Sequence, residues 1–179
     1  AVTPFEQLWR RWNVTATALT IVFMVAVLKS MGRGWWCSCG ELSIWASDIW
    51  SKHQSQHVLD PYSFTHILHG VMYYGLLVPF RRWLPLSLRA YMAVLFATGW
   101  EFIENSDTVI QRYRTATIAL DYYGDSVINS AADVLCCATG FTLTSKLPGW
   151  AGWLFFIGVE VMLALTIKDS LILNIIMLV

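Results

Sequence analysis

The sequence predicts an all-α membrane protein in which residues 1–179 form a single domain, a bundle of about five transmembrane helices. Hydrophobic residues make up 56% of the chain, and its mean hydropathy is +0.53. Only 13% of the residues are charged, which is about half the share in an average soluble domain. The ten tryptophans fit the same class, because this residue gathers at membrane interfaces. A formal net charge of zero gives no indication of a nucleic-acid partner, so we expect contact with membrane lipids and not with nucleic acid.

The expected spans are apolar runs that end at charged residues or at proline. A helix needs roughly 20 apolar residues to cross a bilayer, and five runs approach that length with their flanks. They are residues 14–28, 61–80, 86–103, 124–146 and 150–167. The apolar tail, residues 171–179, is too short to return across the bilayer. We expect it to extend the fifth helix or to lie at the surface.

The connection between the first two spans, residues 30–63, is long. We expect part of residues 41–52 to form an interfacial helix with one apolar side, because long loops without secondary structure are uncommon. Cys37 and Cys39 lie in this loop, and a disulfide, a contribution to a metal site and two free thiols are all open interpretations. His53 and His57, four residues apart, are reserve metal ligands.

Polar residues concentrate in the stretch 99–133, which contains six of the twelve acidic residues of the chain. Because successive spans alternate in direction, the start of the second, the end of the third and the start of the fourth must share one membrane face. Those three ends carry His66 and His69, Glu101 and Glu104, and Asp125 and Asp133. Ionisable groups in a membrane usually face a bundle interior or a water-filled cavity. The sequence therefore predicts a polar cavity at this face.

Residue spacing places these side chains on shared helical faces. The two histidines are three residues apart, as are the two glutamates, so each pair lies on one side of its helix. Along the fourth span, Asp125, Asn129 and Asp133 recur at every fourth position and form a polar stripe, which Ser126 and Ser130 flank.

Two interpretations of this cluster are open. In the functional one, imidazoles and carboxylates from facing helices bind a divalent metal such as zinc, manganese or iron. Its candidate ligands are His66, His69, Glu101 and Asp125. In the structural one, the acids pair with Arg112 and Arg114, and the histidines bond to backbone or carboxylate groups. The number of ionisable groups at one depth favours the functional interpretation, because each is costly in lipid.

Several motifs lie between about residue 33 and residue 148. They are Ser55-Gln56-His57, Asp60-Pro61-Tyr62-Ser63-Phe64-Thr65-His66, His69-Gly70, Trp100-Glu101, Glu104-Asn105, Tyr113-Arg114, Asp121-Tyr122, Gly124-Asp125-Ser126, Asn129-Ser130 and Asp133. This series resembles a bacterial membrane family catalogued as domain of unknown function 2585, a name that implies no particular activity. More distantly, the chain resembles VanZ-like proteins, which are implicated in resistance to glycopeptide antibiotics acting at the cell surface. The two loop cysteines and the long first loop depart from the VanZ-like pattern.

The leading functional hypothesis is an interfacial enzyme that hydrolyses or transfers the head group of a lipid or lipid-linked molecule. Its candidate catalytic residues are Glu101, Glu104, Asp125 and Ser126. Its candidate substrate-binding residues are Arg112, Arg114, Asn129 and Asp133, the arginines for an anionic group such as a phosphate. A second hypothesis is a non-catalytic subunit of a larger membrane complex with protein partners. A third is a small-molecule or ion binding or transport protein, in which Glu160 extends the polar path.

Basic residues are divided equally between the two faces of the predicted bundle, six on each side. We expect the bacterial inner membrane and a cytoplasmic N-terminus, because Arg10-Arg11 and Arg81-Arg82 are clustered beside spans and the first helix often decides orientation. The polar cavity would then face the periplasm.

Overall fold

The computed structural model describes residues 4–41, 43–118 and 121–178, with side chains from residue 12 onward. These residues form α-helices and no β-strand, which confirms the predicted all-α class. The helices are α1 (Pro4–Ser30), α2 (Ser63–Leu77), α3 (Leu86–Glu104), α4 (Asp107–Ala116), α5 (Val127–Thr144), α6 (Gly149–Thr166) and α7 (Leu171–Leu178), and a 3-10 helix, η1 (Val78–Arg82), follows α2.

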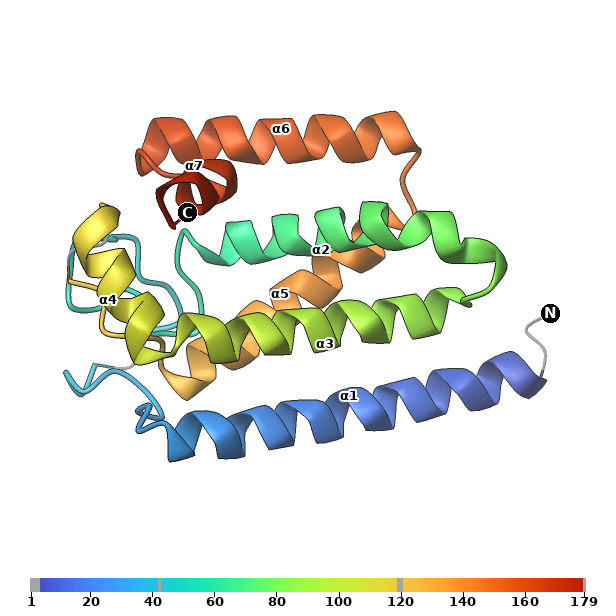
Figure 1. Ribbon diagram of the computed structural model, residues 1–179, viewed down its shortest axis with the longest axis horizontal. Coiled ribbons are helices and arrows are strands. Elements are labelled where there is room, and N and C mark those ends of the chain that lie inside the picture. Colours follow the sequence, from blue (N-terminus) through green and yellow to red (C-terminus); the bar gives the residue numbers. More distant parts are fainter. Residues whose placement is uncertain (1–3, 42, 119–120, 179) are drawn as a thin grey trace.

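The long helices lie along one axis of the molecule. Figure 1 shows α1, α3, α2 and α6 roughly aligned, with α5 crossing behind α2 and α3. The long first loop, α4 and α7 gather at one end of this bundle (Figure 1). Local sequence sets the helix starts: Pro85 and Pro148, both extended, precede α3 and α6, and proline suits the position before or at the first turn. The Ser126 hydroxyl accepts a hydrogen bond from Asn129 N and caps α5.

Helices α2 and α5 are in close contact at two glycines. A Cβ on Gly70 would collide with backbone atoms of Cys137 and Phe141 on α5, and a Cβ on Gly140 would collide with the backbone of Ile67 on α2. Small residues permit this close approach in membrane helices. Because α2 carries both site histidines and α5 carries the polar stripe, the contact sets the distance between them.

Among the described residues, three helices are long and apolar enough to cross a membrane: Trp12–Ser30 of α1, Val127–Thr144 of α5 and Gly149–Thr166 of α6. Large apolar side chains are exposed on α1 and α6, including Leu19, Phe23, Trp153 and Leu165, as expected of lipid-facing surfaces. Helices α2 and α3, which correspond to the predicted second and third spans, are not among these long apolar helices. Membrane association is therefore supported, while five spans and their orientation stay predictions; the side chains of Arg10 and Arg11 lie outside the described residues.

The helix expected over residues 41–52 is not formed by the described residues of that stretch, which make turns. Short polar side chains bond to the local backbone there, with Asp48 Oδ1 accepting from Trp50 N at 2.9 Å and Ser43 Oγ donating to Trp45 O at 2.7 Å. Such bonds compete with helical hydrogen bonding. A short parallel bridge joins Trp45 to Leu59 instead.

The C-terminal tail forms a separate helix, α7, rather than an extension of α6. The chain reverses at Lys168, where φ is 60°, and the Glu160 carboxylate accepts hydrogen bonds from Leu171 N at 3.0 Å and Ile172 N at 3.2 Å. An acid at the start of a helix satisfies free N–H groups and the helix dipole. Glu160, an acid within an apolar span, thus caps α7.

The α2–α5 contact predicts the effect of adding a methyl group at Gly70. We expect Gly70→Ala to destabilise the protein by at least about 1–3 kcal/mol, because the new Cβ meets backbone atoms that cannot rotate away. The measurement is the thermal unfolding midpoint of detergent-solubilised protein, followed by tryptophan fluorescence. Gly75→Ala is the matched control, since Gly75 is an exposed glycine of the same helix with no atom near its missing Cβ. Equal midpoints for the two variants would contradict the proposed role of Gly70.

Candidate functional site

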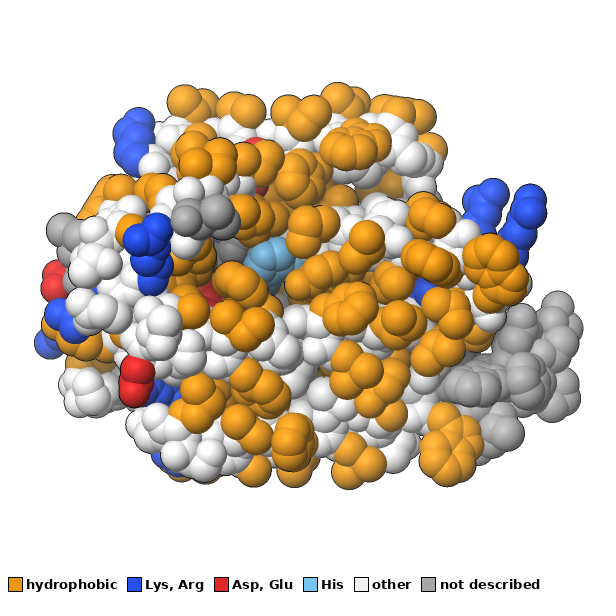
Figure 2. Space-filling model, in the orientation of Figure 1, with side chains coloured by type: hydrophobic (Ala, Val, Ile, Leu, Met, Phe, Trp, Pro, Cys, Tyr) orange, Lys and Arg blue, Asp and Glu red, His pale blue; other side chains and the backbone are white. Residues whose placement is uncertain are grey.

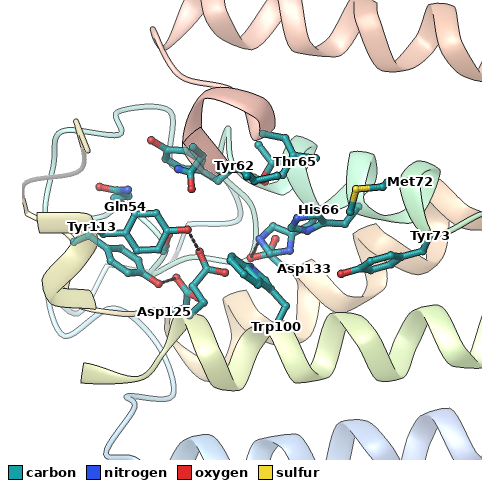
Figure 3. Close-up of a pocket in the computed structure, with 17 residues that line it drawn as sticks. Gln54, Tyr62, Thr65, His66, Met72, Tyr73, Trp100, Tyr113, Asp125 and Asp133 are labelled. Carbon is teal, nitrogen blue, oxygen red and sulfur yellow. Dashed lines mark hydrogen bonds and ion pairs between the residues drawn. The ribbon is translucent and has the colours of Figure 1, made fainter. Parts of the chain in front are cut away.

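A cavity of about 170 Å³ lies at the end of the bundle where the first loop, α4 and α7 meet the core. Figure 3 shows His66 close to Asp133 and Trp100, with Tyr73 toward one side and Asp125 and Tyr113 toward the other. The predicted convergence of three helix ends is confirmed, because α2, the end of α3 and the start of α5 all contribute to the lining. The lining side chains are Gln54, Ser55, Tyr62, Thr65, His66, His69, Met72, Tyr73, Trp100, Glu104, Tyr113, Tyr122, Asp125, Asp133, Leu171, Asn174 and Ile175.

The start of α2 is fixed by Asp60, which is 2% exposed. Its Oδ1 accepts hydrogen bonds from Tyr62 N at 2.8 Å and Ser63 N at 3.3 Å, and its Oδ2 accepts one from Ser55 N at 2.9 Å. Burial raises the pKa of the Asp60 carboxyl, and these N–H donors oppose the rise. Asp60 therefore joins the first loop to α2 and directs His66 inward.

His66 lies between two buried carboxyl groups. Its Nδ1 is 3.6 Å from Glu101 Oε1 on α3, and its Nε2 is 3.7 Å from Asp133 Oδ2 on α5. Glu101 is completely buried, and neither of its carboxyl oxygens has a hydrogen-bond partner. His66, Glu101 and Glu104 each offer a ligand atom within 4.8 Å of the others. These three side chains could therefore hold a metal ion.

Glu104 has one bonded and one free oxygen. Tyr113 donates its hydroxyl to Glu104 Oε1 at 3.0 Å, while Glu104 Oε2 is buried without a partner. His69 lines the same cavity and packs against the rings of Tyr73 and Trp100, with centroids 5.9 and 5.8 Å away. It is not part of the three-residue ligand group.

Asn105 connects the end of α3 to the start of α5. Its amide nitrogen donates to Asp125 Oδ2 at 3.0 Å and to Ser130 Oγ at 3.4 Å, and its amide oxygen accepts from Asp125 N at 2.8 Å. Tyr122 donates its hydroxyl to Asp125 Oδ1 at 2.9 Å. Burial raises the pKa of Asp125 to about 6, against the opposing effect of these hydrogen bonds. Asp125 is thus held by protein donors rather than directed at the ligand group.

The remaining stripe residues face the interior. Asn129 is 1% exposed, its Nδ2 lies 3.5 Å from Val58 O, and its Oδ1 has no partner. Asp133 Oδ1 is also unpartnered. The Ser126 and Ser130 hydroxyls are fully buried, the first as the α5 cap and the second in contact with Asn105.

The two candidate arginines lie outside the cavity, and no lysine or arginine is among its described lining residues. Arg112, exposed on α4, donates its Nε to Leu178 O at 3.3 Å. The Arg114 guanidinium lies 4.6 Å from the centre of the Tyr123 ring. Their role in binding a head group stays a prediction.

Several functional-site residues carried no assigned role in the sequence interpretation. Tyr113 and Tyr122 donate to site carboxylates, and Asn105 and Asp60 organise the helix ends. Asn105 follows Glu101 by four residues, so helical spacing alone could have placed it beside the site. Helical spacing does not mark the tyrosines, because Tyr113 lies on α4 while its partner Glu104 ends α3, and Tyr122 lies in the loop that also carries its partner Asp125.

Helix α7 covers one side of the cavity. Asp169 Oδ2, just before α7, accepts hydrogen bonds from the Tyr62 hydroxyl at 3.1 Å and from Asn174 Nδ2 at 3.2 Å. Burial raises the pKa of the Asp169 carboxyl, and its three hydrogen-bond donors oppose that rise. These bonds hold Leu171 and Asn174 in the cavity wall.

Comparison with known proteins identifies the family. A family model described as protein of unknown function (DUF2585) matches residues 28–179. The chain belongs to the DUF2585 family. UPF0314 proteins match across most of this DUF2585 chain: the one from Paracoccus denitrificans is 42% identical over 91% of this chain and 84% of the relative. The relative from Sinorhizobium fredii is 45% identical over 89% of this chain and 81% of the relative. The relative from Sphingopyxis alaskensis is 39% identical over 94% of this chain and 88% of the relative.

These bacterial relatives confirm the resemblance seen in the motifs of the DUF2585 chain, whereas the more distant VanZ-like relation is not shown by them. No solved structure matches the chain.

The hydrogen bonds of Asn105 predict a large effect of its removal. Asn105→Ala leaves the Asp125 backbone N–H and carboxylate without their buried partner, and each unsatisfied group costs on the order of 1–3 kcal/mol. We expect a lower thermal unfolding midpoint than for Gln111→Ala, the control on the exposed surface of α4. A midpoint unchanged by Asn105→Ala would contradict this assignment.

Proposed function

We propose that this protein is a metal-dependent membrane enzyme that hydrolyses or transfers the phosphate-containing head group of a lipid. The metal ligands are His66, Glu101 and Glu104. The proposal is carried by the four unpartnered ligand atoms of these residues, Nδ1 of His66, both oxygens of Glu101 and Oε2 of Glu104. Buried polar atoms without partners are rare and costly in folded proteins. A divalent cation bound by one atom of each residue would give all three side chains a partner.

The ligand types fit the chemistry of such an ion. One imidazole and two carboxylates suit zinc, manganese or iron. Asp133 on the far side of the His66 ring resembles the carboxylate that orients a metal-binding histidine through its other nitrogen. With several carboxyl groups and no lysine or arginine in the described lining, a bound cation would also offset the negative charge that repels an anionic substrate.

The opening of the cavity supports a lipid substrate. Figure 2 shows a histidine in a hollow that is bordered largely by hydrophobic side chains. Met72 and Ile175, both lining residues, are 40% and 43% exposed. An amphipathic molecule could therefore insert its head group while its apolar chains stay outside. A volume of about 170 Å³ is below the ~300 Å³ of small drug-binding pockets and suits a head group rather than a whole lipid.

Roles follow from position. The ion would polarise a phosphoryl oxygen of the head group and activate a water molecule. Glu104, bonded on one oxygen to Tyr113, has its second oxygen available as a ligand or a general base. Asp125 and Tyr122 shape the opposite wall. The Ser126 hydroxyl is engaged as a helix cap, which favours water over serine as the nucleophile.

Metal content is the direct test of the proposal. Detergent-purified protein would be analysed for metals in a Cys37→Ser, Cys39→Ser background, so that loop thiols hold no ion. We expect about one equivalent of zinc, manganese or iron, lost in His66→Ala and in Glu101→Gln. Asp107→Asn, at an exposed acid of α4, should keep the metal.

Stability separates a metal site from a metal-free acid network. A chelator should lower the unfolding midpoint of the metal-loaded protein and leave Glu101→Gln unchanged, because only the former has an ion to lose. If no metal is found and Glu101→Gln is as stable as wild type, the acids are protonated, the enzyme proposal fails, and a non-catalytic subunit gains support.

Substrate turnover tests the second half of the proposal. Metal-loaded protein would be incubated with vesicles of phosphatidylglycerol and phosphatidylethanolamine, and released head groups measured by mass spectrometry. We expect release that falls by at least about 100-fold in Glu104→Gln. Bound metal without any head-group release from these vesicles would contradict this substrate class and favour ion binding or transport.

A further inference from the structure

The first loop contains a second group of ligand-type side chains, separate from the cavity group. Cys37, Cys39, His53 and His57 each offer an atom within 4.8 Å of the other three. Two come from the turn after α1 and two from the turns that precede α2. Each pair is close in sequence, but the loop must fold on itself to bring the pairs together.

The spacing of the nitrogen and sulfur atoms matches tetrahedral coordination. His53 Nδ1 lies 3.7 Å from Cys37 Sγ, 3.6 Å from Cys39 Sγ and 3.1 Å from His57 Nε2. Zinc bonds of about 2.3 Å to sulfur and 2.0–2.1 Å to nitrogen place tetrahedral S and N ligands about 3.5 Å apart, and two N ligands about 3.3 Å apart.

Hydrogen bonding does not explain this convergence. One imidazole nitrogen carries either one proton or one lone pair, so His53 Nδ1 can serve one of its three neighbours. A cation among the four atoms would bind all of them at once. The half-buried His53 also has a carboxylate at its other nitrogen, with Glu41 Oε2 3.7 Å from Nε2, as in carboxylate–histidine–metal arrangements.

The backbone around the cysteines favours thiolates. Cys39 N donates to Cys37 Sγ at 3.3 Å, and Glu41 N donates to Cys39 Sγ at 3.4 Å. Hydrogen bonds to a charged acceptor are stronger than those to a neutral one. Gly40 adopts φ of 78°, a conformation that glycine takes without steric cost, and this turn brings Glu41 N back toward the sulfur.

The structure records a disulfide between Cys37 and Cys39, so metal binding requires the reduced form. A dithiol reductant would break the S–S bond by exchange, supplying two electrons and two protons and becoming a disulfide itself. The two thiols would then release two protons as the cation binds both thiolates. In the reverse exchange a disulfide oxidant would accept two electrons from the thiolates and become a dithiol, which re-forms the Cys37–Cys39 bond and releases the ion.

From this geometry we propose that reduced Cys37 and Cys39, with His53 Nδ1 and His57 Nε2, form a four-ligand zinc-type site in the first loop. The site fixes one wall of the cavity, because Gln54 and Ser55 lie between the two histidine ligands and line that cavity. Ser55 O accepts from Ser126 N at 2.9 Å, which connects the loop to the start of α5.

Cobalt spectroscopy tests this site independently of the cavity group, which contains no sulfur. Full-length protein in detergent, reduced with a phosphine and freed of metal, would be titrated with Co²⁺. We expect a thiolate-to-cobalt charge-transfer band that saturates at one equivalent and is lost on displacement by Zn²⁺. Disulfide-bonded protein should lack this charge-transfer band.

Variants assign the ligands. The Cys37→Ser, Cys39→Ser double variant should lose the charge-transfer band, while Cys136→Ser, at a cysteine outside the loop, should keep it. Glu41→Gln should weaken Co²⁺ binding by about 10- to 100-fold. Absence of the charge-transfer band from reduced wild-type protein, or its persistence in the double variant, would overturn the proposal. If the double variant does not fold, the charge-transfer bands of reduced and disulfide-bonded wild-type protein still test whether the thiolates bind the ion.

Discussion

An ionised carboxylate away from water is unstable unless an opposite charge or several hydrogen-bond donors lie beside it, and this protein collects buried carboxyl groups around one imidazole. Some of these carboxyl groups have hydrogen-bond donors beside them, and others have none. Asp60 receives backbone N–H groups, and Asp125 receives the Tyr122 hydroxyl and the Asn105 amide. Glu101 receives nothing, and lies 3.6 Å from His66. The contrast between satisfied and unsatisfied acids separates structural carboxylates from those available to a ligand.

Helix packing makes this electrostatic arrangement possible. The glycine contacts between α2 and α5 allow backbones to touch, so that His66 on one helix and Asp133 on the other come within 3.7 Å. Larger residues at the glycine positions would separate the helices by the width of a side chain. The capping of α7 by Glu160 has a comparable effect at the opposite wall, since it turns an apolar tail into a cover for the cavity. Van der Waals packing and helix capping thus set the relative positions of side chains that lie on different helices.

The first loop connects the two groups of potential metal ligands. Its cysteines and His53 lie on one side, while Ser55 and Asp60 hold the start of α2 and α5 on the other. Closing a long loop costs conformational entropy, and a metal or a disulfide within it removes much of that freedom from the unfolded chain. The redox state of two thiols would therefore act on the shape of the cavity wall without any contact to the cavity ligands.

The sequence by itself determined the all-α membrane class, most helix positions and the set of helix ends that form the cavity. Hydropathy and the alternation of spans are local or nearly local signals, and they led to His66, Glu101, Glu104 and Asp133 without coordinates. Tertiary structure decided which acids have hydrogen-bond partners and which do not, because partners such as Tyr113 lie on a different helix from the acid they contact. It also decided that the described residues between 41 and 52 form turns and that the tail folds back as α7, since side-chain bonds to backbone override apolar patterning. Residue spacing fixes which side chains share a helical face; only packing fixes the distances between helices, and those distances create the site.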